Sequence, residues 1–217
     1  MQQIFVYGDS LSWGIIPNTR ARLPFDSRWP GVMENSLNAR EPRVRVIEDC
    51  LNGRRTVWDD PFKPGRNGLA GLAQRIESQS PLALVVLMLG VNDFQSMHTH
   101  NAWHSAQGVA ALINAIRTAP IEPGMPVPPI LVVAPPPLAI ATGTMAPKFS
   151  GGDSKCVGLA DAYREVAAEL GCDFFDAGTV IACSKLDGVH LDAAEHLNLG
   201  EAMANIVRRL LSRSAQS

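Results

Sequence analysis

Five short apolar runs alternate along the chain with longer segments whose apolar residues recur every three or four positions. The runs are rich in Val, Ile, Leu and Phe and cover Ile4–Tyr7, Val44–Ile47, Leu82–Leu89, Ile130–Ala134 and Phe174–Phe175. The periodic segments predict helices over Trp29–Ala39, Gly68–Ser78, Ala102–Thr118, Val157–Leu170 and Ala193–Leu211. Because the runs are apolar throughout rather than at every second residue, they predict parallel strands that are covered on both faces. The pattern is typical of an α/β protein.

Length and charge limit the number of domains and the kinds of partner. The chain has 217 residues, of which 46% are hydrophobic, and a formal net charge of -2. One sizeable core fits this length, so we expect a single domain over residues 1–217. Proteins that bind nucleic acid or an anionic membrane surface usually carry clustered Lys and Arg, and a net charge of -2 does not indicate such a cluster. No run approaches membrane-spanning length and the first strand starts near Met1, so we expect a cytoplasmic protein with small, weakly charged partners.

The four cysteines are scattered without metal-binding or redox spacing, at Cys50, Cys156, Cys172 and Cys183. A chain of this size needs no disulfides to hold its core, so free and mostly buried thiols are expected. A cysteine nucleophile is the alternative, although none of the four lies in a turn that would expose it. Two long segments, Asp59–Gly71 and Pro135–Asp153, are rich in Pro and Gly, which favours loops that serve binding or assembly.

Polar residues follow the predicted strands, and the carboxyl ends of parallel strands meet at one edge where ligands bind. They are Asp9 and Ser10 after the first strand, Asn52-Gly53 after the second, Asn92-Asp93 after the third, and Asp187 with His190 after the fifth. Acyl transfer requires a nucleophile, a base, a group that orients the base, and donors for the oxyanion. The interpretation that fits is Ser10 as nucleophile, His190 as base and Asp187 as its acceptor. The backbone N–H groups of Ser10 and Gly53 and the side-chain amide of Asn92 would then hold the oxyanion.

Several residues offer alternatives to these roles. His196 could replace His190 as base, although a histidine in that helix is expected to face solvent or pack on a loop. Asp176 could replace Asp187, although an aspartate at a strand end more often bonds the following turn.

The cluster of His98, His100 and His104 could hold a metal, but a polar loop over the site or a subunit contact is the simpler interpretation, and we expect no metal. Trp13 is the tryptophan nearest to Ser10 and is the candidate for substrate binding, as a wall of the acyl or alcohol pocket, with simple packing as the alternative.

Four segments together resemble the motif blocks of the GDSL or SGNH hydrolase superfamily. They are GDSLSWG at 8–14, Asn52-Gly53-Arg54, LGVNDF at 89–94 and DGVHLD at 187–192, and they occur in the order found in that superfamily. The resemblance implies a three-layer α/β/α flavodoxin-like fold with a five-stranded parallel sheet in the order 2-1-3-4-5. It also implies that Ser10, Gly53, Asn92, Asp187 and His190 are the functional positions, whereas Asp9 shapes the turn.

A narrower similarity to bacterial arylesterases and acyltransferases covers most of the chain, through VIEDCLNGRRTVWDDP, VVLMLGVNDF, LVVAPPPL and FFDAGTVI. It implies a serine esterase that hydrolyses short-chain acyl and aryl esters through an acyl-enzyme without a cofactor, with acyl transfer to alcohols or peroxide as a second activity. It also implies a homo-oligomer, as large as an octamer. Ile15-Ile16 stand where the acyltransferases of this subgroup carry a second tryptophan, so hydrolysis is implied more firmly than transfer. Alternatives are a carbohydrate acetylesterase or thioesterase with the same triad, and a flavodoxin-like binding protein without turnover.

Overall fold

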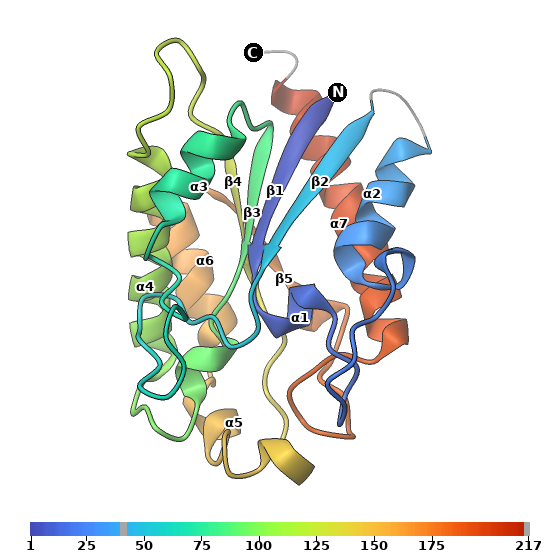
Figure 1. Cartoon of the computed structure of the whole chain (residues 1–217), viewed down its shortest axis with the longest axis vertical. Helices are drawn as coiled ribbons and strands as arrows, with labels where there is room; N and C mark the ends of the chain where they lie inside the picture. The colour runs from blue at the N-terminus through green and yellow to red at the C-terminus, as the bar shows by residue number, and fades with distance from the viewer. Residues whose placement is uncertain (40–42, 215–217) are drawn as a thin grey trace.

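Five parallel strands form the centre of the protein. The structure is a computed structural model that describes residues 1–39 and 43–214. The strands lie in the order β2-β1-β3-β4-β5, as predicted. Their bounds are β1 Gln2–Gly8, β2 Val44–Cys50, β3 Leu84–Met88, β4 Ile130–Ala134 and β5 Asp173–Asp176. All four neighbouring pairs are parallel, so their carboxyl ends share one edge of the sheet, which is the lower edge in Figure 1.

The burial of each strand explains its composition. Every residue of β3 and β4 is buried, so both strands are apolar from end to end. The edge strand β5 is only half-buried along its length and accordingly begins and ends with aspartate. Val85 of β3 pairs with Phe5 of β1 on one side and with Ile130 of β4 on the other, so the core runs continuously through the middle of the sheet.

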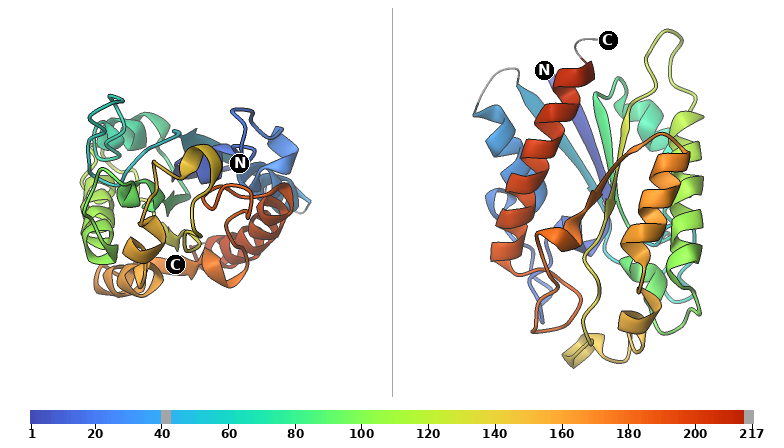
Figure 2. Two further views of the ribbon diagram at one scale, coloured as in Figure 1. Left: turned by 90° about the horizontal axis from the view of Figure 1, so that it is seen from below. Right: turned by 180° about the vertical axis from the view of Figure 1, so that it is seen from behind.

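Helices cover both faces of the sheet and give three layers. On one face lie α2 (Trp29–Asn38) and α7 (Ala193–Ser214), and on the other lie α3 (Leu72–Gln79), α4 (Ala102–Arg117) and α6 (Leu159–Glu169) (Figures 1 and 2). The two helices of the first face pack closely, because a Cβ at Gly200 of α7 would lie 2.5 Å from Cβ of Val32 in α2. The predicted three-layer α/β/α fold is confirmed.

Short helical turns lie at the carboxyl edge of the sheet and were not part of the sequence prediction. They are α1 (Ser10–Trp13), α5 (Gly152–Lys155) and 3-10 turns at Phe25–Ser27, Val91–Phe94, Gly143–Met145 and Ala177–Thr179. Turns of three or four residues are too short to show a hydrophobic period, so the pattern could not reveal them. Two of them carry Ser10 and Asn92. Among the helices described, none has the length and apolar character needed to cross a membrane.

Candidate active site

The turn after β1 places Ser10 at the start of α1. Oδ1 of Asp9 accepts a hydrogen bond of 2.9 Å from the N–H of Leu11 and so caps this short helix. Gly8 makes the tight turn possible, because a Cβ at this position would lie 2.5 Å from Oγ of Ser12. Ser10 is 5% exposed. Asp9 therefore shapes the turn, as expected, and Ser10 is held on a rigid element at the carboxyl edge of the sheet.

The loop before α7 joins a histidine to an aspartate. Nδ1 of His190 lies 2.7 Å from Oδ2 of Asp187. The other oxygen of Asp187 accepts hydrogen bonds from the backbone N–H groups of Val189 at 3.0 Å and His190 at 2.9 Å. Gly188 between them has φ +77°, a left-handed conformation that favours glycine and turns the chain so that both side chains project from one loop. Burial opposes ionisation of Asp187, but these hydrogen bonds outweigh it and lower its pKa to about 2.

With its Nδ1–H donated to a carboxylate, the His190 ring keeps Nε2 as an acceptor. Such a tautomer can take a proton from a hydroxyl and afterwards return it. His190 and Ser10 line the same pocket. The arrangement places a histidine that is paired with an aspartate in the same pocket as a serine hydroxyl.

Two backbone donors of the proposed oxyanion site remain available. In the part of the chain that the structure describes, the N–H groups of Ser10 and Gly53 donate to no other protein group, and both residues line the pocket. Gly53 has φ +84°, a left-handed conformation. A Cβ added at this position would have room, because its nearest neighbour would be Cγ of Arg66 at 3.8 Å. Its backbone conformation, rather than crowding by neighbours, is therefore the visible reason for glycine at this position.

Asn92 also lines the pocket, but its amide already has partners. Nδ2 donates to Oδ2 of Asp9 at 3.0 Å and to the carbonyl of Arg54 at 3.1 Å, and Oδ1 accepts from Gln95. Burial raises the pKa of Asp9 to about 6, although its hydrogen bonds with Leu11 and Asn92 and the charge of His190 oppose this shift. Asn92 thus links the Ser10 turn to the Gly53 loop. Its Nδ2 can donate a hydrogen bond to an oxyanion only in addition to the two that it already makes.

Two buried arginines that the sequence analysis did not single out support this loop. Arg54 donates to the carbonyls of Gly8 and Asp49, and its guanidinium lies 3.9 Å above the ring of Tyr7. Arg55 donates to the carboxylate of Asp60 at 2.9 Å, to Oε1 of Gln95 and to the ring of His98. Two consecutive basic residues after a glycine usually indicate a solvated turn, and only the pairing of each guanidinium makes its burial possible.

The pocket around Ser10 is a narrow cavity of about 70 Å³. Its lining combines the candidate catalytic residues with charged and apolar side chains from three loops: Ser10, Ile15, Arg20, Asn52, Gly53, Asp60, Lys63, Asn92, Met145, Lys148, Phe149 and His190. The structure thus brings together Ser10, Gly53, Asn92 and His190, the last with Asp187 hydrogen-bonded behind it. Three of the lining side chains are cations, although the net charge of the whole chain is only -2.

Trp13 is not among the residues that line this cavity, and its role as a wall of the substrate pocket stays a prediction. Residues 14–23 fold back on themselves through a bridge between Ile15 and Arg22. This hairpin places the guanidinium of Arg22 4.8 Å over the Trp13 ring, while its Nε donates to the Trp13 carbonyl. The indole therefore packs under an arginine, and Ile15 lines the pocket instead.

The rival residues have structural contacts of their own. His196 is fully buried in α7 and accepts a hydrogen bond of 3.3 Å from the N–H of Trp29, which corrects the expectation of a solvent-facing side chain. Burial lowers the pKa of His196 to about 4, with the nearby charges of Arg28 and His190 adding to the effect. Asp176 accepts a hydrogen bond of 2.9 Å from the N–H of Gly178, which confirms its predicted structural role.

The histidines of the predicted cluster pack as a stack of rings. The centroids of Trp58 and His100 are 3.9 Å apart, those of His98 and His100 are 4.8 Å apart, and His104 lies at 5.5 Å from His100. His98 also accepts from Arg55, and His104 is paired with Asn101 at the start of α4. Within the described ranges, no group of three or more His, Cys, Asp or Glu side chains is arranged to hold a metal ion. The stack instead braces the loop that carries Arg55.

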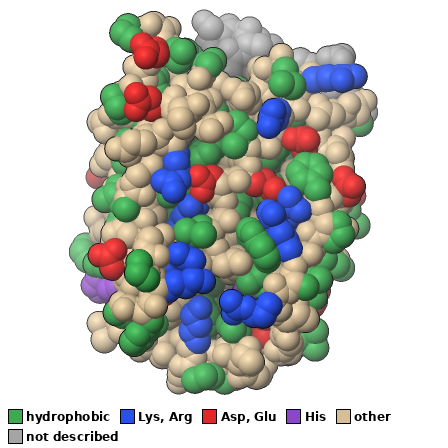
Figure 3. Space-filling view, in the orientation of Figure 1, with side chains coloured by type: hydrophobic (Ala, Val, Ile, Leu, Met, Phe, Trp, Pro, Cys, Tyr) green, Lys and Arg blue, Asp and Glu red, His purple; other side chains and the backbone are tan. Residues whose placement is uncertain are grey.

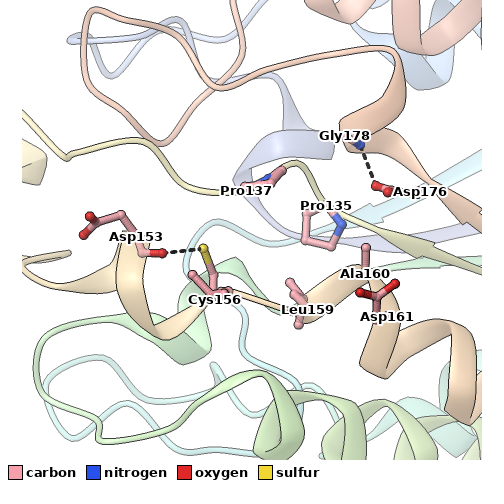
Figure 4. Close-up of a pocket in the computed structure, with 11 residues that line it drawn as sticks. Pro135, Pro137, Asp153, Cys156, Leu159, Ala160, Asp161, Asp176 and Gly178 are labelled. Atoms are coloured by element: carbon pink, nitrogen blue, oxygen red, sulfur yellow. Dashed lines mark hydrogen bonds between the residues drawn. The ribbon is translucent and has the colours of Figure 1, made fainter.

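A second and larger cavity, of about 340 Å³, lies beyond the carboxyl ends of β4 and β5 and beside α6 (Figure 4). It is lined by Pro135, Pro137, Asp153, Cys156, Val157, Gly158, Leu159, Ala160, Asp161, Asp176 and Gly178.

The Cys156 thiol donates to the carbonyl of Asp153, and burial raises its pKa. Burial likewise raises the pKa of Cys183 to about 12. All four cysteines are free, as expected, and these two are poor candidates for a thiolate nucleophile.

Comparison with known proteins agrees with this architecture. Residues 6–203 match the GDSL-like lipase/acylhydrolase family. An aryl esterase from M. smegmatis is 36% identical over 97% of this chain and 100% of its own, with a TM-score of 0.91. Est24, a carbohydrate acetylesterase from Sinorhizobium meliloti, is 35% identical over 97% of this chain and 100% of its own, with a TM-score of 0.90. A search of curated proteins gave no match.

The fold and these matches define a carboxylic ester hydrolase. The chain belongs to the GDSL-like lipase/acylhydrolase family, because the match covers most of its length and solved structures above 30% identity span nearly all of it.

Proposed function

We propose that the protein is a serine esterase in which Ser10 is the nucleophile, His190 the general base and Asp187 the acid that orients it. The observation that carries the proposal is the 2.7 Å contact between His190 Nδ1 and Asp187 Oδ2, together with Ser10 and His190 in one pocket. The lowered pKa of Asp187 supports it, because an ionised carboxylate stabilises the imidazolium that forms during the reaction.

The reaction follows from these groups. Oγ of Ser10 bonds to the ester carbonyl carbon while its proton passes to Nε2 of His190. The carbonyl oxygen becomes an oxyanion that accepts from the free N–H groups of Ser10 and Gly53. The C–O bond to the alcohol then breaks, and the alcohol leaves with the proton from His190. Water attacks the acyl-enzyme by the same route in reverse and releases the acid.

Short-chain acyl and aryl esters are the proposed substrates, because the pocket of about 70 Å³ admits only a small group and because the M. smegmatis relative is an aryl esterase. Deacetylation of a carbohydrate is a second candidate, favoured by the similarity to Est24. Transfer of the acyl group to an alcohol or to peroxide is a proposed side activity. Hydrolysis is proposed as the main activity, because Ile15 in the pocket lining stands where the related acyltransferases carry a tryptophan.

The proposed homo-oligomer, as large as an octamer, is supported by apolar side chains left exposed on the loops. Phe62 is 81% exposed, Ile140 76% and Leu186 58%. Light scattering at two protein concentrations tests this assembly, and a monomer at both would refute it. The free thiols of all four cysteines support the proposed location in the cytoplasm, where thiols stay reduced.

The test of the function is rapid mixing with 4-nitrophenyl acetate. We expect a burst of nitrophenolate that matches the enzyme concentration, and an acetyl group on Ser10 in the mass spectrum of quenched protein. Ser10→Ala should show neither and should keep the circular dichroism spectrum of the native chain. A burst of equal size in the variant would assign the nucleophile elsewhere.

A further inference from the structure

Three positive side chains from three separate loops converge on the pocket that holds Ser10. Arg20 comes from the hairpin after α1, Lys63 from the loop that follows the Gly53 turn, and Lys148 from the segment before α5. Figure 3 shows Lys and Arg side chains gathered on the lower half of this face, on the side where the strands end. Because the chain as a whole has a net charge of -2, this local excess of positive charge is a property of the site rather than of the protein.

The single carboxylate in the lining does not neutralise these cations. Oδ2 of Asp60 accepts from Nη1 of the buried Arg55 at 2.9 Å, and Oδ1 accepts from the backbone N–H groups of Phe62 and Lys63. The charge of Asp60 is therefore matched by Arg55.

The three cations have no partner of opposite charge among the described residues. Within residues 1–39 and 43–214, Arg20, Lys63 and Lys148 form no ion pair with a carboxylate. Other arginines do form such pairs, for example Arg28 with Glu48 and Arg75 with Asp49.

The cations also repel one another. Burial lowers the pKa of Lys148, and the charges of Arg55, Lys63 and Arg20 lower it further, while Asp60 opposes them. Burial and the charges of Arg66 and Arg20 likewise lower the pKa of Lys63. A cluster of three cations whose one neighbouring carboxylate is already paired with Arg55 binds an anion more readily than a neutral group, because the anion relieves this repulsion.

We propose that the pocket binds an ester that carries a carboxylate beside the scissile bond, and that Arg20, Lys63 and Lys148 hold this carboxylate. The inference rests on the proposed role of Ser10 and deepens it by naming the substrate class. The chemistry is unchanged: water cleaves the ester bond by way of the Ser10 acyl-enzyme, and the carboxylate takes no part in bond making. Its contribution is to position the ester, since the cations attract and orient it in a cavity with room for only a small group.

The test compares charged and neutral esters of nearly the same shape. One pair places the charge on the alcohol side, 4-acetoxybenzoate against its methyl ester, and a second places it on the acyl side, monophenyl succinate against phenyl butyrate. We expect the ratio of kcat/KM for the charged ester to that for its neutral partner to fall about tenfold in Lys148→Met, as for loss of one charge-assisted contact. The same loss is expected in Lys63→Met or Arg20→Gln. The pair that responds shows which side of the ester faces the cations.

Matched controls remove the same charges outside the pocket. Lys185 and Arg209 lie at exposed positions that do not line the pocket. Lys185→Met and Arg209→Gln should both leave the ratio within about twofold of the native value, because exposed charges outside the pocket are screened by salt. Raising sodium chloride should lower the native ratio and leave that of the triple variant Arg20→Gln, Lys63→Met, Lys148→Met unchanged. A ratio that is equal in native protein and pocket variants for both pairs would overturn the proposal.

Binding to Ser10→Ala gives a readout that does not depend on turnover. Calorimetry with 4-acetoxybenzoate and its methyl ester should show tighter binding of the charged molecule, and this difference should vanish when Lys148→Met is added. Hydrolysis of the neutral esters through Ser10 without any preference for charge would leave the proposed function intact and refute the anionic subsite. Absence of the acetyl adduct on Ser10 of the native protein would refute the proposed function. The difference in binding measured by calorimetry would then show by itself whether the cations bind the carboxylate.

Discussion

The two cavities at the carboxyl edge of the sheet differ in size, charge and chemistry. The one beside α6 has about 340 Å³ and contains the carboxylates of Asp153, Asp161 and Asp176. The one around Ser10 has only about 70 Å³, yet it contains a serine and a histidine oriented by an ionised carboxylate. The difference teaches that volume does not locate the reaction in this fold. Under the proposed function, the reaction is located by the side chains that β1, β3 and the loop before α7 bring to one pocket.

The largest difference between the two cavities is expected when one aspartate in each region is neutralised. Asp187→Asn should lower kcat for 4-nitrophenyl acetate by about 10³- to 10⁴-fold, because the imidazole loses the acceptor that fixes its tautomer. Asp176→Asn should change kcat by less than about twofold, since its carboxylate bonds the N–H of Gly178 in the other cavity. A large loss in Asp176→Asn with none in Asp187→Asn would reverse the assignment of the acid.

Substitution of Gly53 tests the proposed oxyanion donors. Gly53→Ala forces alanine into a conformation with φ +84°, which costs roughly 1–2 kcal/mol and shifts the N–H that faces the substrate. We expect kcat to fall about 10- to 100-fold, which is less than the roughly 10²- to 10³-fold loss found when an oxyanion donor is removed, because the N–H is displaced and not deleted.

The matched control is Gly124→Ala, where φ is +88° and a Cβ would meet nothing within 4 Å. It should lose similar stability in urea unfolding and retain its kcat. If both variants lost activity equally, the effect of Gly53→Ala would be one of stability alone.

The stability of the Ser10 region should depend on pH with opposite signs at its two aspartates. Asp187 has a pKa of about 2 instead of 3.8, so its ionised form stabilises the fold above pH 4 by about 2 kcal/mol, and this contribution is lost as the pH falls toward 2. Unfolding free energies of native protein and Asp187→Asn should therefore converge between pH 4 and pH 2.

Asp9 provides the contrast, because its pKa is raised to about 6. Its contribution is complete below pH 4 and is lost as the pH rises toward 6. The native protein should lose stability over this interval relative to Asp9→Asn. A difference between these two proteins that stayed constant from pH 4 to pH 6 would contradict the environment assigned to Asp9.

The smallest effect is expected in the larger cavity. Val157 lines it and is 75% exposed, so Val157→Ser removes a methyl-bearing side chain without burying a polar group. We expect kcat and KM for 4-nitrophenyl acetate to stay within about twofold of the native values, as for surface substitutions in general. A tenfold change in KM would mean that this cavity also takes part in binding the substrate.

The sequence predicted the sheet well because its strands are buried runs with clear ends. Val44–Cys50 and Ile130–Ala134 begin where the apolar runs begin. At the site, the motif blocks predicted Ser10, His190 and Asp187, which lie directly after strands or in a short loop. The structure brings them together because parallel strands end at one edge.

The residues that prediction missed depend on contacts between distant loops. Arg20, Lys63 and Lys148 come from three segments without a period, and no local pattern shows that such segments converge. The sequence analysis gave Arg55 no role, and its burial depends on its hydrogen bonds to Asp60 and Gln95. Trp13 was placed by its nearness in sequence to Ser10, whereas the hairpin after α1 sets its actual neighbour, Arg22.

The most direct test of the account is intact-protein mass spectrometry after exposure to a neutral activated organophosphate, in the presence of EDTA. The reagent requires an activated nucleophile and no knowledge of the natural substrate. The account predicts one adduct on the native chain, located on Ser10 by peptide mapping and missing from Ser10→Ala. An unmodified native protein that is folded, or an adduct that persists in Ser10→Ala, would contradict the assignment of Ser10 as the nucleophile.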